Sequence, residues 1–220
     1  MGETLANQVL LMFSGGRDST LAALRLHDAG HPLKLVTITA GYLFGLNNVE
    51  RRLREIAPML PAKTEWLQIV QPTLRTQHFF HQQTCLPCQS AYVIAGASVA
   101  RQTGIGKIAL GYASYQADWP EQGPQATMLL QNTLTRHGFE LMLPAYDIES
   151  RASAIQELKA RGLSELALEQ KCTRQVNNVN LEGQELSQQL KLWAKAIDEE
   201  LSNGRLLLDV SKRMCLEDLK

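Results

Sequence analysis

The chain has 220 residues, of which 45% are hydrophobic and 20% are charged, a composition ordinary for one compact globular domain. Lys and Arg together number 22, as do Asp and Glu, so the net charge is zero. This balance argues against a protein that binds nucleic acid or membrane through a broad basic face. No apolar run reaches the roughly 18 residues of a membrane span, and the N-terminus lacks the pattern of a signal peptide. We therefore expect a cytoplasmic protein with a single domain over residues 1–220.

Apolar runs typical of buried strands alternate along the chain with helical patterns. The expected strands are Gln8–Phe13, Leu33–Thr39, Thr64–Val70, Lys107–Gly111 and a short one around Leu141–Leu143. The expected helices are Ser19–Ala29, Val49–Ala57, Ser90–Thr103, Arg151–Arg161 and Glu185–Ser202. This alternation predicts an α/β fold, with a Rossmann-like parallel sheet and helices on both faces. Such sheets bind ligands beyond the carboxyl ends of their strands, so residues after the first, second and fourth strands are site candidates.

The stretch Ser14-Gly-Gly-Arg-Asp-Ser19 follows the first strand and opens a helix. Its two glycines let a bulky anion approach the main chain, and the unpaired N–H groups at the helix start favour a phosphate. Ser14, Ser19 and Thr20 add hydroxyl donors, and the carboxylate of Asp18 suits either Mg²⁺ beside the phosphates or a helix cap. The Walker A pattern is absent. From the residues alone, a phosphate site and a simple capped turn both stay open.

In this position SGGRDS resembles the SGGxDS signature of the PP-loop ATP pyrophosphatases. The resemblance implies the PP-loop (HUP-type) fold and an adenylating activity on ATP bound with Mg²⁺. In that reaction ATP is cleaved between its α and β phosphates, AMP passes to a substrate oxygen, and pyrophosphate is released. The residues implied to surround the nucleotide phosphates are Ser14, Gly15, Gly16, Arg17, Asp18, Ser19 and Thr20. Among them, Asp18 and Ser19 are expected to be catalytic.

Three further residues complete the nucleotide site that the resemblance implies. Arg151 follows Ser150 at a helix start and is similar to the basic residue of the family's "P…SK" element, so we expect a catalytic role. Thr39 ends the second strand and is expected beside the adenine, and Gly111 ends the fourth strand and would let the nucleotide approach. Each position also has a simpler interpretation, as an exposed arginine or as a strand that runs into a turn.

In a reducing compartment, cysteines serve more readily as ligands, redox groups or buried thiols than as disulfides. The four in this chain are Cys85, Cys88, Cys172 and Cys215. Two thiolates in a CxxC pair can share one metal ion, and all four could hold zinc, which predicts a metal subsite formed by 85–88 and the C-terminal part. If only Cys85, Cys88 and Cys172 converge, they could instead hold a [4Fe-4S] cluster with one open iron, with His78 or His81 as substitute ligands.

Two branches of the family account for these cysteines differently. Overall size, neutral charge and the helix leading to Cys172 resemble 7-cyano-7-deazaguanine synthase, an enzyme of queuosine biosynthesis with a structural zinc, which implies a ligase that uses a nitrogen nucleophile. The layout of Cys85, Cys88 and Cys172 is also similar to that of the cluster-dependent tRNA thiolation enzymes. A third hypothesis is a nucleotide-binding sensor or partner subunit without turnover. The expected partners are a small heterocyclic substrate, favoured over tRNA, and a second copy in a homodimer.

The polar segment Tyr112–Gln125 leaves the carboxyl end of the fourth strand and is predicted to be a loop. Its aromatic residues, Tyr112, Tyr115 and Trp119, are suited to stack on a planar heterocycle. The carboxylates of Asp118 and Glu121 are suited to accept the N–H groups of such a ring. The simpler alternative is an ordinary wet loop with buried aromatic side chains. The tail after Asn203 has no clear pattern.

Overall fold

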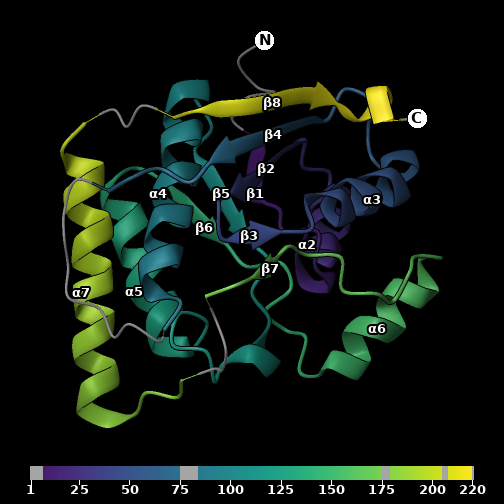
Figure 1. Cartoon of the computed structure of the whole chain (residues 1–220). Coiled ribbons are helices and arrows are strands. Elements are labelled where there is room, and N and C mark those ends of the chain that lie inside the picture. The colour runs from purple at the N-terminus through teal and green to yellow at the C-terminus, as the bar shows by residue number, and fades with distance from the viewer. Residues whose placement is uncertain (1–6, 75–83, 175–178, 205–207, 220) are drawn as a thin grey trace.

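The computed structural model describes residues 7–74, 84–174, 179–204 and 208–219. At its centre is a six-stranded sheet (Figure 1). The strand order is β6-β5-β1-β2-β4-β8. The parallel strands are β1 (Val9–Met12), β2 (Leu33–Thr39), β4 (Glu65–Val70), β5 (Lys107–Leu110) and β6 (Glu140–Met142). Strand β8 (Val210–Cys215) pairs antiparallel with β4 and forms an edge of the sheet. The predicted Rossmann-like fold is therefore confirmed, with one antiparallel edge strand added.

Helices cover both faces of the sheet (Figure 1). One face carries α2 (Arg17–Asp28), α3 (Leu46–Ile56) and α6 (Arg151–Ala160), and the other carries α4 (Leu86–Thr103), α5 (Pro124–Arg136) and α7 (Gly183–Ser202). Successive side chains of a strand point to opposite faces, so Leu10 and Met12 of β1 pack with α4 while Val9 and Leu11 pack with α2. Burial on both sides explains why the central strands are continuous apolar runs.

Three predicted elements differ from the structure in ways that matter for the site. The expected loop 112–125 overlaps the start of α5, a helix that was not predicted, and the tail contains β8. Helix α4 begins at Leu86, four residues before the expected start, so Cys85 is its N-cap and Cys88 lies in its first turn. A short antiparallel ribbon joins β3 (Leu43–Phe44) to β7 (Lys171–Cys172).

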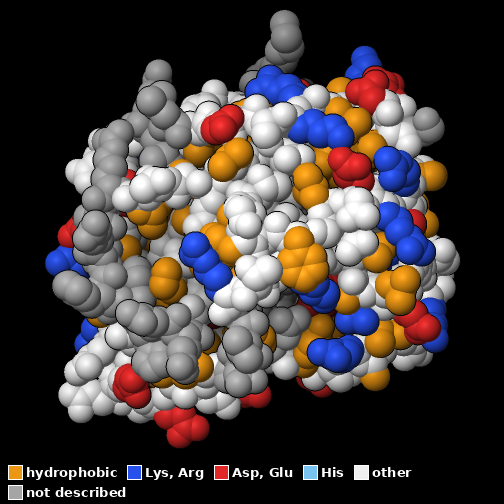
Figure 2. Space-filling view, in the orientation of Figure 1, with side chains coloured by type: hydrophobic (Ala, Val, Ile, Leu, Met, Phe, Trp, Pro, Cys, Tyr) orange, Lys and Arg blue, Asp and Glu red, His pale blue; other side chains and the backbone are white. Residues whose placement is uncertain are grey.

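Basic and acidic side chains are interspersed over the visible face in Figure 2, as the zero net charge suggests. On α3, for example, Arg51 pairs with Glu55, and Arg54 pairs with Glu50. Across the four described ranges, no helix combines the length and apolar character needed to cross a membrane.

Candidate functional site

The loop between β1 and α2 is closely packed and depends on two glycines. Gly15 has φ +78°, a left-handed conformation that other residues rarely adopt, and an added Cβ would lie 2.9 Å from Leu168 O and 3.0 Å from Val49 Cα. Gly16 is the N-cap of α2 and has no side chain to occupy the first amide groups of the helix. The first amide groups of the helix therefore have no side-chain cap at Gly16, a feature that an anion-binding loop would need.

Hydroxyl groups of the loop have two different tasks. Ser14 Oγ and Ser19 Oγ lie 3.0 Å apart. The backbone N–H of Gly16 donates to Ser14 Oγ, and that of Ser14 donates to Ser19 Oγ. Thr20 is fully buried and its hydroxyl donates to Gly16 O at 2.6 Å, so it supports the loop from behind. Ser14 and Ser19 line the cavity described next, whereas Thr20 does not.

A cavity of about 530 Å³ lies at the carboxyl ends of β1 and β5. It brings together most of the residues expected to bind the nucleotide phosphates and to be catalytic. Those that line it are Ser14, Gly16, Arg17, Asp18, Ser19, Gly111 and Arg151. Arg17 lies at the start of α2, and its Nε donates to Glu165 O at 2.9 Å. The cavity is therefore bordered by basic groups from two helices that are far apart in the sequence.

Asp18 is the buried acidic group of this cavity, with 7% of its surface exposed. Burial raises its pKa above the usual value, and the hydrogen bond from the Tyr115 hydroxyl is the largest opposing effect. The charges of Arg17 and Arg151 also favour the ionised form, whereas that of Glu169 disfavours it. An ionised carboxylate is costly to bury alone, and a cation bound beside it lowers that cost. Asp18 therefore suits a hard metal ion such as Mg²⁺.

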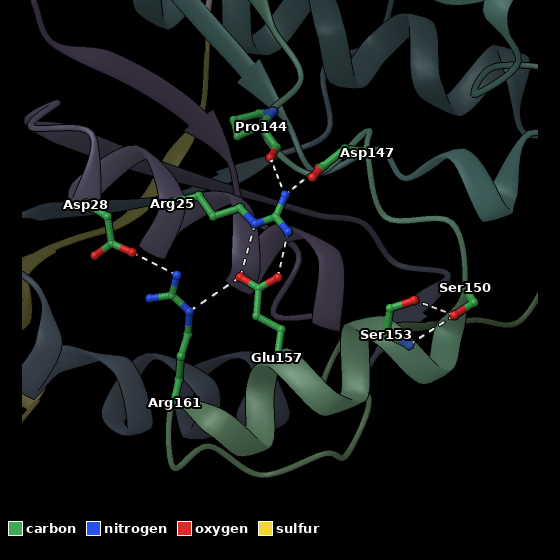
Figure 3. A network of polar contacts seen from close by, with 8 residues as sticks. All are labelled: Arg25, Asp28, Pro144, Asp147, Ser150, Ser153, Glu157 and Arg161. Atoms are coloured by element: carbon green, nitrogen blue, oxygen red, sulfur yellow. Dashed lines mark hydrogen bonds and ion pairs between the residues drawn. The ribbon is translucent and has the colours of Figure 1, made fainter.

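Arg151 occupies the first turn of α6, whose N-cap Ser150 accepts a hydrogen bond from Ser153 N at 3.0 Å (Figure 3). Further along α6, Glu157 receives two hydrogen bonds from Arg25 of α2. Arg25 also donates to Pro144 O at 3.0 Å and pairs with Asp147. These contacts attach α6 and the segment before it to α2 (Figure 3). Arg151 lines the same cavity as the loop that precedes α2.

Gly111 lines the cavity and also has a packing role. An added Cβ at this position would lie 2.5 Å from Ser19 Cα, so the glycine allows the end of β5 to pass close to the first turn of α2. Thr39 donates to Ile69 O at 3.3 Å and lines neither this cavity nor the next one. Its neighbours Thr37 and Ile38 do line the second cavity, so the end of β2 still borders the candidate site.

The segment after β5 borders the cavity, although its residues differ in their tasks. Tyr112, Trp119 and Asp118 line the cavity as the sequence suggests. Tyr115 also lines it, but its hydroxyl is engaged by Asp18, and the resulting contact together with burial raises the pKa of Tyr115 to about 12. Glu121 is only 2% exposed and does not line the cavity, and burial raises its pKa to about 7. Glu121 is therefore not positioned to meet a ligand there.

Three of the four cysteines line a second cavity of about 230 Å³, which also borders Tyr42 and Gln170. Cys85 and Cys88 come from the start of α4, while Cys172 is placed by the pairing of β7 with Leu43 of β3. Tyr42 Oη lies 3.4 Å from Cys88 Sγ, and burial, followed by this contact, raises the pKa of Tyr42. The residues that line both cavities are Ser14, Gln89, Tyr92 and Glu169. The two cavities therefore share a wall.

The expected four-cysteine zinc site needs correction. Cys215 pairs with Glu65 at the amino end of β4, whereas the other three cysteines lie near the carboxyl ends of the strands. Thiols suit a soft metal ion, yet within the described ranges no three His, Cys, Asp or Glu side chains form a group that could hold one. His78 and His81, the alternative ligands, lie outside the described residues.

Glu169 is a site residue that was not predicted. It lines both cavities, and its Oε2 would lie 3.2 Å from a Cβ added at Gly16. Lys171 pairs with its other oxygen at 2.7 Å. The segment 163–170 has no regular helix or strand and no recognisable motif. Tertiary contacts bring Glu169 to the loop, among them the packing of Leu168 against Gly15 and the hydrogen bond from Gln170 to Ile38 O.

No family model matches the sequence, and no curated protein matches it. Solved structures with a similar chain path include a 4-thiouridine synthetase in complex with RNA and bound ATP, with a TM-score of 0.59 and 15% sequence identity. That match covers 92% of this chain, which spans only 55% of the synthetase.

Two weaker matches are to proteins with other reported activities. The U34-tRNA thiolase NcsA from Methanococcus maripaludis, solved with its [4Fe-4S] cluster, has a TM-score of 0.49 and 13% identity over 91% of this chain and 73% of that one. An NMN synthetase from Francisella tularensis has a TM-score of 0.45 and 11% identity over 96% of this chain and 92% of that one. The likeness to the 4-thiouridine synthetase establishes the shared Rossmann-like fold.

Proposed function

We propose that this chain is an ATP-dependent adenylating enzyme. It cleaves ATP between the α and β phosphates, transfers AMP to an oxygen of a second substrate, and releases pyrophosphate. The observation that carries the proposal is the single cavity lined by the loop residues Ser14, Asp18 and Ser19 together with Arg151. The resemblance of SGGRDS to the PP-loop signature supports α–β cleavage in particular. The ATP reported in the similar 4-thiouridine synthetase is consistent with this ligand.

The residues of the cavity suit the demands of this reaction. The loop N–H groups and the hydroxyls of Ser14 and Ser19 bind phosphate oxygens, and Arg17 and Arg151 stabilise the negative charge of the departing pyrophosphate. Asp18 would hold Mg²⁺, a cation that prefers oxygen ligands and neutralises phosphate charge when bound. Little further chemistry is needed, because positioning and charge stabilisation account for such a transfer.

The second substrate in this proposal is a small planar heterocycle. Tyr112 and Trp119 give the cavity two aromatic side chains, and Gln89 and Gln122 contribute amide groups that can bind the edge of a ring. An incoming nitrogen nucleophile, as in the deazaguanine-synthase-like ligases, would attack the carbon that bears the adenylated oxygen. The C–N bond would form as the C–O bond breaks, and AMP would leave with that oxygen.

Pyrophosphate release from ATP, measured with a panel of heterocyclic acids and lactams, tests the proposal. We expect release that requires a second substrate and that falls by at least about 100-fold in Asp18→Asn and Arg151→Ala. Arg54→Ala removes an exposed arginine of α3 and should leave the rate unchanged. ATP binding without pyrophosphate release from any substrate would favour the sensor hypothesis instead.

A second candidate function is sulfur transfer. The observation in its favour is that Cys85, Cys88 and Cys172 line one cavity that shares a wall with the proposed ATP site, while Cys215 is remote. Within the described ranges the three cysteines do not form a ready metal-binding group, so a cluster would have to draw them together. Anaerobic purification followed by iron and zinc analysis and a visible spectrum tests it. Sulfur transfer predicts bound iron and a brown protein that Cys172→Ser bleaches and Cys215→Ser does not. A colourless protein whose metal content is unaffected by Cys172→Ser would contradict it.

A further inference from the structure

The carboxylate of Asp18 is held by two consecutive residues of the short helix η2 (Ser114–Gln116). The hydroxyl of Tyr115 lies 2.8 Å from Oδ2 and 3.0 Å from Oδ1, and Gln116 Nε2 donates to Oδ2. Gln116 Nε2 also lies 3.1 Å from the Tyr115 hydroxyl. Both donors come from the segment after β5, nearly 100 residues away from the loop in the sequence.

The orientation of the Gln116 side-chain amide follows from the Asp18 carboxylate that it contacts. An ionised carboxylate only accepts hydrogen bonds, so Gln116 must turn its NH₂ group toward Asp18 and its oxygen away. That oxygen accepts a hydrogen bond from Gln122 Nε2 at 3.2 Å. Tyr146 then donates to Gln122 O at 2.8 Å, which fixes the end of the same segment. The Gln116 amide is therefore oriented by Asp18 and the Gln122 side chain, whereas Tyr146 reaches only the backbone of Gln122.

Helix η2 is also attached to the segment that carries Arg151. Ser114 Oγ donates to Ile148 O at 2.9 Å, and Tyr115 N donates to the same oxygen at 3.3 Å. Ile148 precedes Arg151 by three residues. The short helix thus contacts the acidic group of the cavity on one side and the backbone leading to its basic group on the other.

We propose that Tyr115 and Gln116 are positioning residues that aim the Asp18 carboxylate for a divalent cation bound with the nucleotide. The inference rests on the proposed function, because it takes Asp18 as the carboxylate that meets the metal. Hydrogen bonds from two side chains restrict rotation of the carboxylate. Tyr115 has one proton to share between the two oxygens and Gln116 donates to Oδ2, so Oδ1 keeps a free lone pair for the cation. Partners of this kind usually change metal affinity by 10- to 100-fold when they are removed.

Binding of Mn²⁺ in the presence of α,β-methylene ATP tests the inference, since this nucleotide cannot be cleaved between its α and β phosphates. Mn²⁺ binding is followed by electron paramagnetic resonance, and nucleotide binding in EDTA is measured separately. We expect Tyr115→Phe and Gln116→Met each to weaken Mn²⁺ binding about tenfold. Nucleotide affinity in EDTA should stay within about twofold of wild type, which a general disturbance of the fold would not allow.

Tyr146→Phe is the matched control, because it removes a hydroxyl that supports the same segment at Gln122 without touching Asp18. It should bind Mn²⁺ as the wild type does. Mn²⁺ affinity within about twofold of wild type in both Tyr115→Phe and Gln116→Met would overturn the inference, as would an equal loss in Tyr146→Phe. Wild-type protein that binds neither the nucleotide nor Mn²⁺ would overturn the proposed function, and the inference with it.

Discussion

The guanidinium of Arg25 and the carboxylate of Glu157 form two parallel hydrogen bonds, 3.0 Å from Nε to Oε1 and 2.6 Å from Nη2 to Oε2 (Figure 3). Both side chains are one quarter exposed, so water screens the pair only in part. Because α2 begins with the phosphate loop and α6 begins with Arg151, this pair helps to set the distance between the two halves of the candidate site.

Loss of this pair should weaken the fold. We expect Glu157→Gln to lower the free energy of unfolding by about 2 kcal/mol, because Arg25 loses a charged, bidentate partner. Urea denaturation measures the difference. Lys159→Gln is a control on the same helix, since it removes an exposed ion pair with Glu165 and should cost less than about 1 kcal/mol. Equal effects of the two substitutions would contradict the role given to Glu157.

Stability should also depend on the ionisation of Glu121. Burial raises the pKa of this carboxyl from 4.5 to about 7, and its Oε2 has no hydrogen-bond partner among the described residues. The folded state therefore holds the proton more tightly than the unfolded state, and stability falls as the pH rises from about 4.5 to about 7. Relative to Glu121→Gln, the wild type should lose about 3 kcal/mol between about pH 4 and pH 8.

Denaturation curves of both proteins across this pH range test the Glu121 prediction. Glu140→Gln, at the exposed start of β6, serves as the control and should follow the wild type at every pH. A difference between wild type and Glu121→Gln that does not change with pH would show that the carboxyl has the same pKa in the folded and unfolded protein, and would contradict the prediction.

Gly111→Ala should damage both the fold and nucleotide binding. The added methyl group would lie 2.5 Å from Ser19 Cα, and neither the end of β5 nor the first turn of α2 can move without disturbing the sheet. We expect a loss of about 2 kcal/mol in unfolding free energy and weaker ATP binding. At Gly106, before the same strand, an added Cβ meets nothing within 4 Å, so Gly106→Ala should be neutral or slightly stabilising. Thermal unfolding and ATP titration distinguish the two.

The elements that could be predicted from the sequence are those whose signal is local. The central strands are apolar because both faces of the sheet are covered, and the phosphate loop consists of neighbouring residues with a recognisable order. Strand β8 was not predicted because its side chains are mostly exposed or half-buried, and its conformation depends on pairing with β4. Helix α5 was not predicted because the polar segment before it was extended into its first residues, Pro124 and Gln125.

Predictions about the site were limited by contacts between distant segments. Nothing near Asp18 in the sequence indicates that Tyr115 and Gln116 hold its carboxylate, and Tyr115 was expected to stack on a ligand. Glu169 reaches the loop only through tertiary packing. The expected role of Gly111 beside the nucleotide stays a prediction, while its close approach to Ser19 of α2 is a packing constraint that local sequence cannot show.

Helix α2 is attached at both ends to the chain that runs from α6 toward β7. Arg17, the first residue of α2, donates to Glu165 O at 2.9 Å. Asp28, its last residue, accepts a hydrogen bond from Arg161 at 2.7 Å. The 12 residues of α2 span about 18 Å, so the two attachments hold opposite ends of one helix. Loss of the Arg161 side chain, remote from the cavity, would therefore release the far end of the helix that carries Arg17 and Asp18, while the attachment at Arg17 stays in place.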